Sequence, residues 1–480
     1  MPAPPPAERA ATTATRDMPA GGFLSFRATA IRAAREIAVP TGLLLLCVLA
    51  YANALRAPFQ FDDFVAFADY AGAQSLAGWW AAMPGIRPLL KLSYALNAHL
   101  SPAPLGYHFV NLALHIANTL MVFALLRRWP GAALGAAAAF LGAAVFALHP
   151  AQTEAVTYLA GRSVSLMASF YLAALLAWVR CDSHWRLPLT IGFFLLALAC
   201  KETAVTLPAA LLLWEYARDR RAGEAEGRVA RVRAALRATA PLWLVLLLAA
   251  LALSALPRYR TLFALSLSLR TPLENLFAQV AGIGYLVTRP LLTLRTNIDP
   301  DIATPTGFTA YAALGALALV GLITFGFAQL RSRPGLALAV LWFFLHLAPT
   351  NSLLPRLDLA NDRQLYLALI GPAWLVATGL QQLGACHLRI AIAVALALIL
   401  TLGAATIARN RDYRSEVALW SATVRQSPHK ARAWNNLGLA LRLAGQDAMA
   451  AAAYQRALEI DPSFEQARIN MGVLLLRRTP

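Results

Sequence analysis

Long apolar runs alternate with short polar connections along most of this chain. About 20 residues of helix are needed to cross the hydrocarbon core, and an α-helix satisfies its own backbone hydrogen bonds there. The pattern therefore predicts an all-α, polytopic membrane protein. We expect about eleven transmembrane helices, at residues 41–57, 107–127, 131–148, 163–180, 187–200, 203–216, 239–256, 308–329, 335–349, 364–380 and 389–407.

The orientation of these helices follows from the basic connections. Runs 187–200 and 203–216 are short, so they are expected to tilt or to form a hairpin that does not fully cross. Segment 275–293 either spans or lies in the interface. The interfacial alternative puts the arginine-bearing connections on one face, as the positive-inside rule requires. We therefore expect a cytoplasmic N-terminus, an uncleaved first helix and an extracytoplasmic C-terminus.

Composition agrees with this class. The chain is 59% hydrophobic and 14% charged, whereas soluble domains are about a quarter charged. The net charge of +18 is carried almost wholly by arginine, which anchors topology in cytoplasmic loops, so we expect no nucleic-acid partner. The four cysteines lie in or beside apolar runs without CxxC spacing, which predicts neither a disulfide framework nor a zinc site.

The character of the sequence changes after residue 408. Residues 431–464 place seven side chains at the signature positions of a tetratricopeptide repeat: Trp434, Leu437, Gly438, Ala450, Tyr454, Ala457 and Pro462. Half-repeats are expected on both sides, at 414–430 and 465–478. The short array is expected to dock a peptide, to cap the membrane domain or to mediate dimerisation.

Three parts are therefore predicted: a disordered cytoplasmic N-terminus (1–38), a transmembrane domain (39–408) with its first outer loop at 58–105, and a repeat domain (409–480). In this topology charged side chains far apart in sequence reach one outer face. They are Asp62 and Asp63, the block 149–162, Lys201 and Glu202, the loop 294–306 and the segment 356–366. Charged groups at helix ends beside a shared interior are functional candidates, although anchoring or loop solvation explains many of them.

The second predicted helix carries a polar stripe. His108, Asn111, His115 and Asn118 share one helical face, which should contact protein or water instead of lipid. Hydrogen bonding between helices explains the deeper members, whereas His108 lies near the outer mouth, where it can contribute to a site.

A carboxylate pair beside several cations suits group transfer from a phosphate carrier. A carboxylate acts as general base on a hydroxyl, and guanidinium and ammonium groups bind phosphate. Membrane access favours a donor with a polyprenyl tail, so we expect inverting transfer of a sugar from a polyprenyl phosphate. A transporter or flippase of a lipid-linked substrate and a non-catalytic membrane scaffold are the alternatives.

Several motifs occur in the order found in one known family. They are "FDDF", "RPL" at 87–89, "GYHFVNLALHIANTL", "LHPAQTEAVTYLAGRSVSLMASFYLAALL" at 148–176, "KET" at 201–203 and "NDRQLYL" at 361–367. Together with the repeat, they resemble the TMTC family of transmembrane, tetratricopeptide-repeat O-mannosyltransferases and its bacterial relatives, within the GT-C class. The resemblance implies a bacterial inner (cell) membrane location and an acceptor protein or glycan, docked by the repeats.

The resemblance also implies roles for individual residues. Asp62 or Asp63, with Asp62 slightly favoured, matches the general base of the first outer loop, and Glu154 resembles a second acidic position. Donor contacts are expected from Arg87, His108, His149, Arg162, Lys201, Glu202, Arg363 and Tyr366. His149 with Asp62 and Glu154 could bind a divalent metal, but no metal or other cofactor is expected. Structural roles remain open for Asp63 as a helix cap, for a Glu154–Arg162 pair and for a Lys201–Glu202 pair.

Overall fold

The computed structural model describes residues 37–476, apart from 84, 132–133, 219–227, 294–295 and 304–308. The predicted N-terminal segment 1–38 thus lies almost entirely outside the described residues. The chain divides into two units, 1–42 and 43–480, and the description below concerns the second. Every regular element in the described ranges is helical, so the prediction of an all-α fold is confirmed there.

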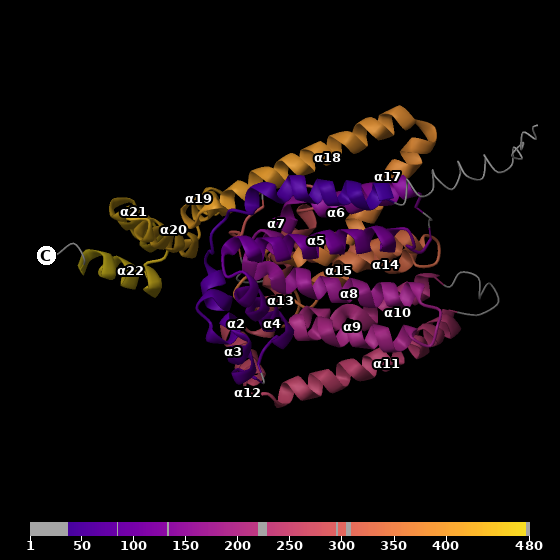
Figure 1. The fold of residues 1–480 in the computed structure, drawn as a ribbon, viewed down its shortest axis with the longest axis horizontal. Coiled ribbons are helices and arrows are strands. Elements are labelled where there is room, and N and C mark those ends of the chain that lie inside the picture. The colour runs from indigo at the N-terminus through magenta and orange to yellow at the C-terminus, as the bar shows by residue number, and fades with distance from the viewer. Residues whose placement is uncertain are drawn as a thin grey trace, which may run out of the picture. The chain divides into compact units, whose positions relative to one another are not determined.

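Figure 1 shows the helices of the second unit. In the membrane-like part they are α2 (Ala71–Gln74), α3 (Leu76–Ala81), α4 (Pro88–Leu100), α5 (Pro104–Leu126), α6 (Ala136–Leu148), α7 (Thr153–Val156), α8 (Arg162–Arg180), α9 (Arg186–Cys200), α10 (Leu207–Arg218), α11 (Arg228–Ala255), α12 (Pro257–Leu269), α13 (Pro272–Thr288), α14 (Ala310–Gln329), α15 (Pro334–Leu347), α16 (Leu365–Ala368), α17 (Ile370–Cys386) and α18 (Leu388–Asn410). Four further helices follow α18: α19 (Glu416–Gln426), α20 (Ala431–Leu443), α21 (Asp447–Ile460) and α22 (Glu465–Leu476).

Fewer helices meet the length of a membrane span than the eleven predicted. In the described ranges, six are long and apolar enough: Ile37–Ala54, Pro104–Leu126, Leu159–Arg180, Val229–Ala255, Ala312–Gln329 and Leu388–Arg414. Two bent pairs raise the number to eight if each is one span. These are Ala136–Leu148 with Pro150–Val156, bent by 51°, and Asp362–Ala368 with Ile370–Cys386, bent by 55°. The other predicted spans form shorter helices, so eleven crossings are not confirmed.

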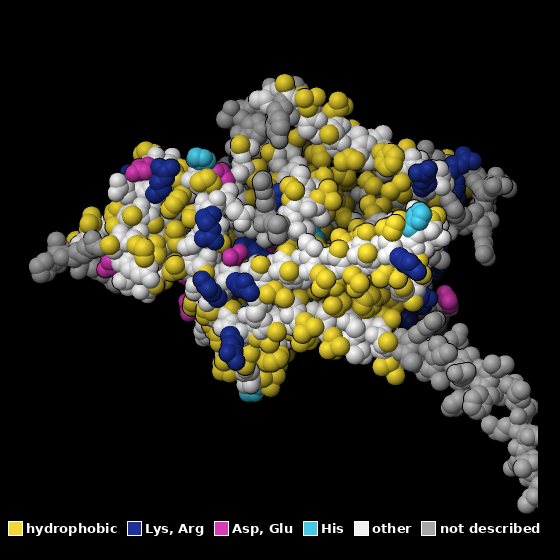
Figure 2. All heavy atoms as spheres, turned by 90° about the horizontal axis from the view of Figure 1, so that it is seen from above, with side chains coloured by type: hydrophobic (Ala, Val, Ile, Leu, Met, Phe, Trp, Pro, Cys, Tyr) yellow, Lys and Arg dark blue, Asp and Glu magenta, His cyan; other side chains and the backbone are white. Residues whose placement is uncertain are grey.

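Exposed apolar side chains mark a membrane-facing surface. On α11, Leu244, Leu247, Leu248 and Leu251 are each more than half exposed, which a water-soluble fold would avoid. Figure 2 shows hydrophobic side chains spread over the middle of the visible face, while many Lys and Arg side chains lie toward its ends. This distribution is typical of a helical membrane protein.

The polar stripe of α5 turns inward, as predicted. Its four members, His108, Asn111, His115 and Asn118, are buried, whereas Phe109 and Val110 on the opposite face are exposed. The Asn111 and Asn118 amides donate to the carbonyls of Val156 and Ser165. The stripe therefore binds α5 to the α7–α8 region.

Helices α20 and α21 form the complete tetratricopeptide repeat. Gly438 of α20 is needed because a Cβ there would lie 2.6 Å from the Tyr454 ring of α21. The turn between them uses Gly445 at φ +73°, a conformation that favours glycine. The predicted half-repeats are also helical, as α19 and α22, and they pack against α20 and α21.

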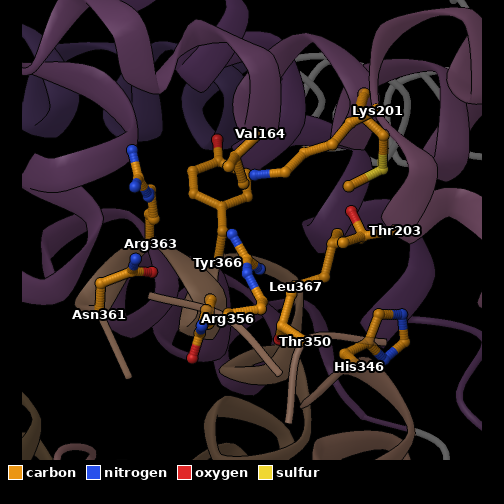
Figure 3. Close-up of a pocket in the computed structure, with 12 residues that line it drawn as sticks. Val164, Lys201, Thr203, His346, Thr350, Arg356, Asn361, Arg363, Tyr366 and Leu367 are labelled. Carbon is orange, nitrogen blue, oxygen red and sulfur yellow. The ribbon is translucent and has the colours of Figure 1, made fainter. Parts of the chain in front are cut away.

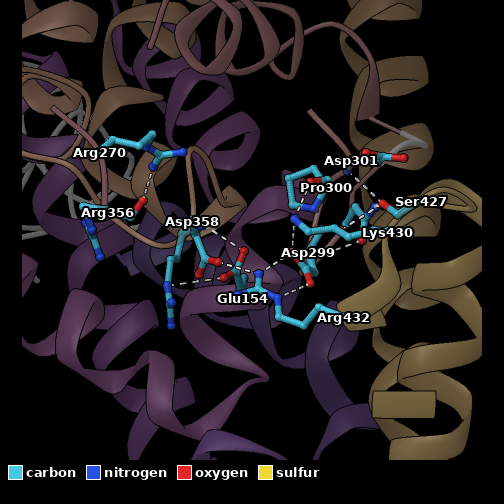
Figure 4. Close-up of polar contacts among 12 residues, drawn as sticks. Glu154, Arg270, Asp299, Pro300, Asp301, Arg356, Asp358, Ser427, Lys430 and Arg432 are labelled. Atoms are coloured by element: carbon cyan, nitrogen blue, oxygen red, sulfur yellow. Dashed lines mark hydrogen bonds and ion pairs between the residues drawn. The ribbon is translucent and has the colours of Figure 1, made fainter. Parts of the chain in front are cut away.

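The repeat domain is bound to two loops between helices α13 and α16 (Figure 4). The buried Asp299 carboxylate accepts from the guanidinium of Arg432 and pairs with Lys430. Arg432 also pairs with Asp358 of the second loop. The Ser427 hydroxyl donates to the Asp299 carbonyl at 2.9 Å. One face of the repeat domain is thus occupied by contacts within this chain.

Replacing Asp299 with alanine is expected to loosen this attachment. The change removes a buried acceptor shared by two cations, which should weaken docking by about 2 kcal/mol. Hydrogen exchange should become faster in α19 and α20 while exchange in α5 and α8 stays unchanged. Asp301→Ala is the matched control, because the Asp301 side chain is exposed. Equal exchange in the two variants would contradict the assigned role of Asp299.

Candidate functional site: a pocket lined by cations

The first outer loop presents its two aspartates differently. The Asp63 carboxylate is buried and accepts hydrogen bonds from the amides of Gln60, at 2.9 Å, and Ala160, at 2.7 Å. Burial raises the pKa of Asp63 to about 7, although both amide hydrogen bonds oppose the shift. Asp63 thus fixes the loop to the turn before α8, close to the capping role that the sequence left open.

Asp62 keeps its carboxylate available. Its side chain is half-buried, and among the described residues no donor is bound to it. Its backbone amide donates to the Tyr158 hydroxyl at 3.0 Å. The Asp62 charge interacts electrostatically with Tyr158 and with Arg363. Of the two aspartates, Asp62 therefore has the free carboxylate that a general base requires.

A pocket with three basic side chains lies among the ends of several helices (Figure 3). Its cavity volume is about 30 Å³, so the side chains that line it lie close together. Its cations are Lys201, Arg356 and Arg363, which come from the α9–α10 junction, a loop and the segment before α16. The Tyr366 ring lines the same pocket. The full lining is Val164, Met167, Lys201, Thr203, His346, Thr350, Arg356, Asn361, Arg363, Gln364, Tyr366 and Leu367.

The pocket holds more positive charge than its carboxylates neutralise. Lys201 makes no ion pair in the part of the chain that the structure describes. Burial holds the pKa of Lys201 well below its usual range, and Arg87, Arg363 and Arg356 lower it further. Burial, Arg363 and Arg87 also lower the pKa of Arg356. An anion bound here would relieve this repulsion, so the geometry suits phosphate.

The carboxylates near the pocket are already paired. Glu202 forms a bidentate contact with Arg87, with Arg87 Nη2 2.7 Å from Glu202 Oε2, and also accepts from the Tyr259 hydroxyl at 3.3 Å. Glu202 therefore pairs with Arg87 and not with Lys201, the alternative that the sequence left open. Glu154, which is buried, accepts from the Arg363 amide at 3.1 Å and lies 3.4 Å from its Nε. It pairs with Arg363 and not with Arg162.

Arg162 is not among the residues that line the pocket. Its guanidinium is fully buried and donates to the side-chain oxygens of Asn111, at 2.7 Å, and Asn97, at 2.8 Å. It also donates to the carbonyls of Ser93 and Tyr107. Because these acceptors use its donors, Arg162 holds α4 and α5 against α8. We therefore remove it from the residues expected to bind a lipid phosphate.

Substituting Arg162 with methionine should lower stability strongly. The change leaves buried amide and carbonyl oxygens without donors, each costing about 1–3 kcal/mol. Thermal unfolding in detergent is expected at a clearly lower temperature than for the wild-type protein. Arg218→Met is the control, since the Arg218 side chain is 51% exposed. An unfolding temperature for Arg162→Met equal to that of the wild-type protein would contradict this structural role and would favour a role of Arg162 in donor binding.

The predicted histidines have protein partners. His108 Nε2 lies 3.0 Å from the Ala57 carbonyl oxygen, and His149 Nδ1 accepts from the Ala151 amide at 3.2 Å. The Tyr366 hydroxyl lies 2.9 Å from His115 Nδ1 and accepts from Asn118. Among the described residues, no three His, Cys, Asp or Glu side chains are grouped to hold a metal ion. His149, Asp62 and Glu154 therefore form no metal site.

Two residues of the site were not selected from the sequence. Arg356 lines the pocket, and the Tyr158 hydroxyl accepts from the Asp62 amide. Both lie in segments that the sequence singled out, 356–366 and 149–162. Its place at the start of the charged segment 356–366 was the available signal for Arg356. The contact between the Tyr158 hydroxyl and the Asp62 amide depends on tertiary packing, so no local sequence pattern indicated it.

Comparison with known proteins identifies the repeat near the C-terminus. Residues 431–464 match the family model described as tetratricopeptide repeat. Protein O-mannosyl-transferase Tmtc1 of Drosophila melanogaster is 39% identical over 199 residues, covering 37% of this chain and 22% of that protein.

Longer matches extend over nearly the whole chain. Protein O-mannosyl-transferase Tmtc3 of Drosophila melanogaster is 26% identical over 523 residues, covering 90% of this chain and 56% of the relative. Protein O-mannosyl-transferase TMTC3 of Homo sapiens is 24% identical, covering 91% and 53%. The chain thus spans about half the length of these relatives. The chain is thus similar to protein O-mannosyl-transferases over nearly its whole length, and it has a tetratricopeptide repeat near its C-terminus.

Proposed function

We propose that this protein is a membrane glycosyltransferase that transfers a sugar from a polyprenyl phosphate to an acceptor hydroxyl. The observation that carries the proposal is the pocket in which Lys201, Arg356 and Arg363 meet without enough carboxylate to balance them. The names of the similar proteins, protein O-mannosyl-transferase, support mannose as the sugar and a protein as the acceptor.

In the proposed reaction Asp62 acts as general base. Its carboxylate takes the proton of the acceptor hydroxyl, and the acceptor oxygen forms a bond to the anomeric carbon of the donor. The bond from that carbon to the phosphate oxygen breaks, and its electron pair leaves with the polyprenyl phosphate. A single displacement of this kind inverts the anomeric centre. A base that is well placed typically contributes about 10²–10⁴-fold to the rate.

The cations stabilise the leaving phosphate, which gains negative charge as the bond breaks. Lys201 and Arg356 have no carboxylate bound to them among the described residues, so they can bind phosphate directly. Arg363 pairs with Glu154 and also interacts with the Asp62 charge. Arg363 therefore connects the phosphate-binding side of the site to the base. Arg87 and Glu202 are paired with each other, and both interact electrostatically with Lys201.

The remaining parts of the proposal concern the membrane. We place the site on the extracytoplasmic face of a bacterial cell membrane, in a GT-C-like domain with eleven crossings and the repeat domain on the same side. Sugar nucleotides are cytoplasmic, so a site on this face requires a lipid-carried donor. The pocket lies among helices with exposed apolar faces, which agrees with entry of a polyprenyl chain from the bilayer.

A donor screen tests the proposal. The purified chain is incubated with a panel of polyprenyl-phosphate sugars, which includes mannose, and with a protein extract as acceptor. Transfer from at least one polyprenyl-phosphate sugar, and none from the matching sugar nucleotides, is expected. Transfer from none of the panel would contradict the function. Release of the sugar lipid across vesicles without transfer would favour a flippase.

A further inference from the structure

Phe61, the residue before the proposed base, has an unusual backbone conformation. Its φ is +47°, in the left-handed region that bulky side chains rarely adopt. Such a conformation persists only where surrounding contacts hold it, and such positions cluster at functional sites. Because Phe61 directly precedes Asp62, whatever holds Phe61 also sets the direction of the chain at Asp62.

The contacts that hold Phe61 come from the repeat domain. The Phe61 amide donates to Glu416 Oε1 at 2.7 Å. Its ring meets the ring of Trp420 edge to face, with centroids 5.0 Å apart. Glu416 and Trp420 lie one turn apart on α19, so a single helix face holds both the backbone and the side chain of Phe61.

The residues beside Phe61 are attached to the same region. The Gln60 side-chain amide donates to the carbonyl of Tyr413, just before α19. The Asp62 amide donates to Tyr158, whose ring lies 6.3 Å from the Tyr413 ring. Tyr158, Tyr413 and Trp420 belong to one apolar cluster that continues into the core of the repeat domain. The loop with Asp62 and the start of the repeat domain are therefore packed together.

We propose that α19 is a positioning element of the active site, with Glu416 and Trp420 as positioning residues for Asp62. The inference rests on the function proposed above and assigns the repeat domain a part in the chemistry in addition to any docking of an acceptor. A repeat domain that shifts α19 would change the orientation of the base and thereby the rate of transfer.

Glu416 is not needed for the other structural tasks nearby. The N-terminus of α19 is capped by Ser415, whose hydroxyl accepts from the Ala418 amide at 3.1 Å. The repeat domain is docked through separate contacts of Lys430 and Arg432 with Asp299. Removing the Glu416 carboxylate therefore leaves the helix cap and the docking contacts in place, which separates positioning from folding.

The experiment compares Glu416→Ala with Glu416→Gln, which keeps an acceptor oxygen for the Phe61 amide. The measured quantities are kcat and KM for polyprenyl-phosphate mannose, or for whichever donor the screen selects. Glu416→Ala is expected to lower kcat about tenfold or more, because small misplacements of a catalytic group have effects of this size, with KM unchanged. Glu416→Gln should restore most of kcat. Glu459→Ala, on the exposed surface of α21, is the control and should match the wild-type protein.

Hydrogen exchange measures directly whether the backbone around Asp62 loosens, which an activity measurement does not show. In Glu416→Ala, amides between residues 59 and 64 should exchange faster, while those of α20 and α21 should not. If Glu416→Ala fails to fold, Phe61→Gly takes its place, because glycine keeps the backbone conformation and removes only the ring contact.

The outcomes separate this inference from the proposed function. Wild-type transfer that Asp62→Asn abolishes and Glu416→Ala leaves intact would overturn the positioning role alone. Lower kcat in Glu416→Ala without faster exchange near Asp62 would also overturn it. No transfer by the wild-type protein from any donor would overturn both proposals.

Discussion

Asp62→Asn is expected to reduce sugar transfer by about 10²–10⁴-fold, the usual contribution of a general base. Asparagine has nearly the same shape but cannot accept the proton of the acceptor hydroxyl. The Asp62 side chain accepts no hydrogen bond among the residues described, so the fold should not change. The measurement is the initial rate of transfer, with thermal unfolding as a check on structure.

Two variants of the same loop serve as controls for Asp62→Asn. Asp69→Asn changes an exposed carboxylate and should leave both the rate and the unfolding temperature unchanged. Asp63→Asn removes a buried carboxylate that accepts from two amides, so it should lower stability. If Asp62→Asn transferred sugar at the wild-type rate, Asp62 would not be the base, and the proposed mechanism would fail.

Lys201→Met is expected to make the protein more stable and much less active. Lys201 is a cation among three arginines, and methionine fills a similar volume without charge. Removing a desolvated cation that has no ion-pair partner removes its desolvation penalty, so the free energy of unfolding should rise. Loss of a charged hydrogen bond to phosphate costs about 1.5–3 kcal/mol, which raises the Kd for the donor by about 10–100-fold.

The pH dependence of stability gives Lys201→Met a second signature. A lysine whose pKa is lowered in the folded state binds its proton more weakly there than in the unfolded chain. Between the folded pKa and the unfolded value of about 10.4, wild-type stability therefore rises with pH, and the variant lacks this rise. Lys91→Met is the control, since Lys91 donates to the Tyr70 hydroxyl at 3.1 Å and lies outside the pocket lining. A lower free energy of unfolding for Lys201→Met than for the wild-type protein would contradict this prediction, because it would mean that other groups stabilise the charge of Lys201.

Much of the architecture was readable from the sequence because it depends on local pattern. Apolar runs marked the helices, and the spacing from Trp434 to Pro462 marked α20 and α21. The polar stripe of α5 indicated a buried face for the same reason, since its members repeat with the period of a helix. The number of spans was less accessible, because short apolar helices such as α9 and α15 differ from full spans only in length.

The pairing of charges in the site could not be read from the sequence. No local sequence pattern distinguishes Arg162, whose guanidinium donates to acceptors within the protein, from Arg363, which lines the pocket. The same holds for Glu202, whose partner Arg87 lies more than a hundred residues earlier in the chain. These contacts depend on which helix ends meet, and tertiary packing alone decides that.

Donor affinity and turnover, measured together for Asp62→Asn and Lys201→Met, test the central claim most directly. That claim is that one outer-face site contains a base and a separate group of phosphate-binding cations. The account predicts that Asp62→Asn binds the polyprenyl-phosphate sugar with the wild-type Kd but transfers almost none of it, whereas Lys201→Met binds the donor weakly. Equal donor affinity in Lys201→Met and the wild-type protein, or lost affinity in Asp62→Asn, would contradict it.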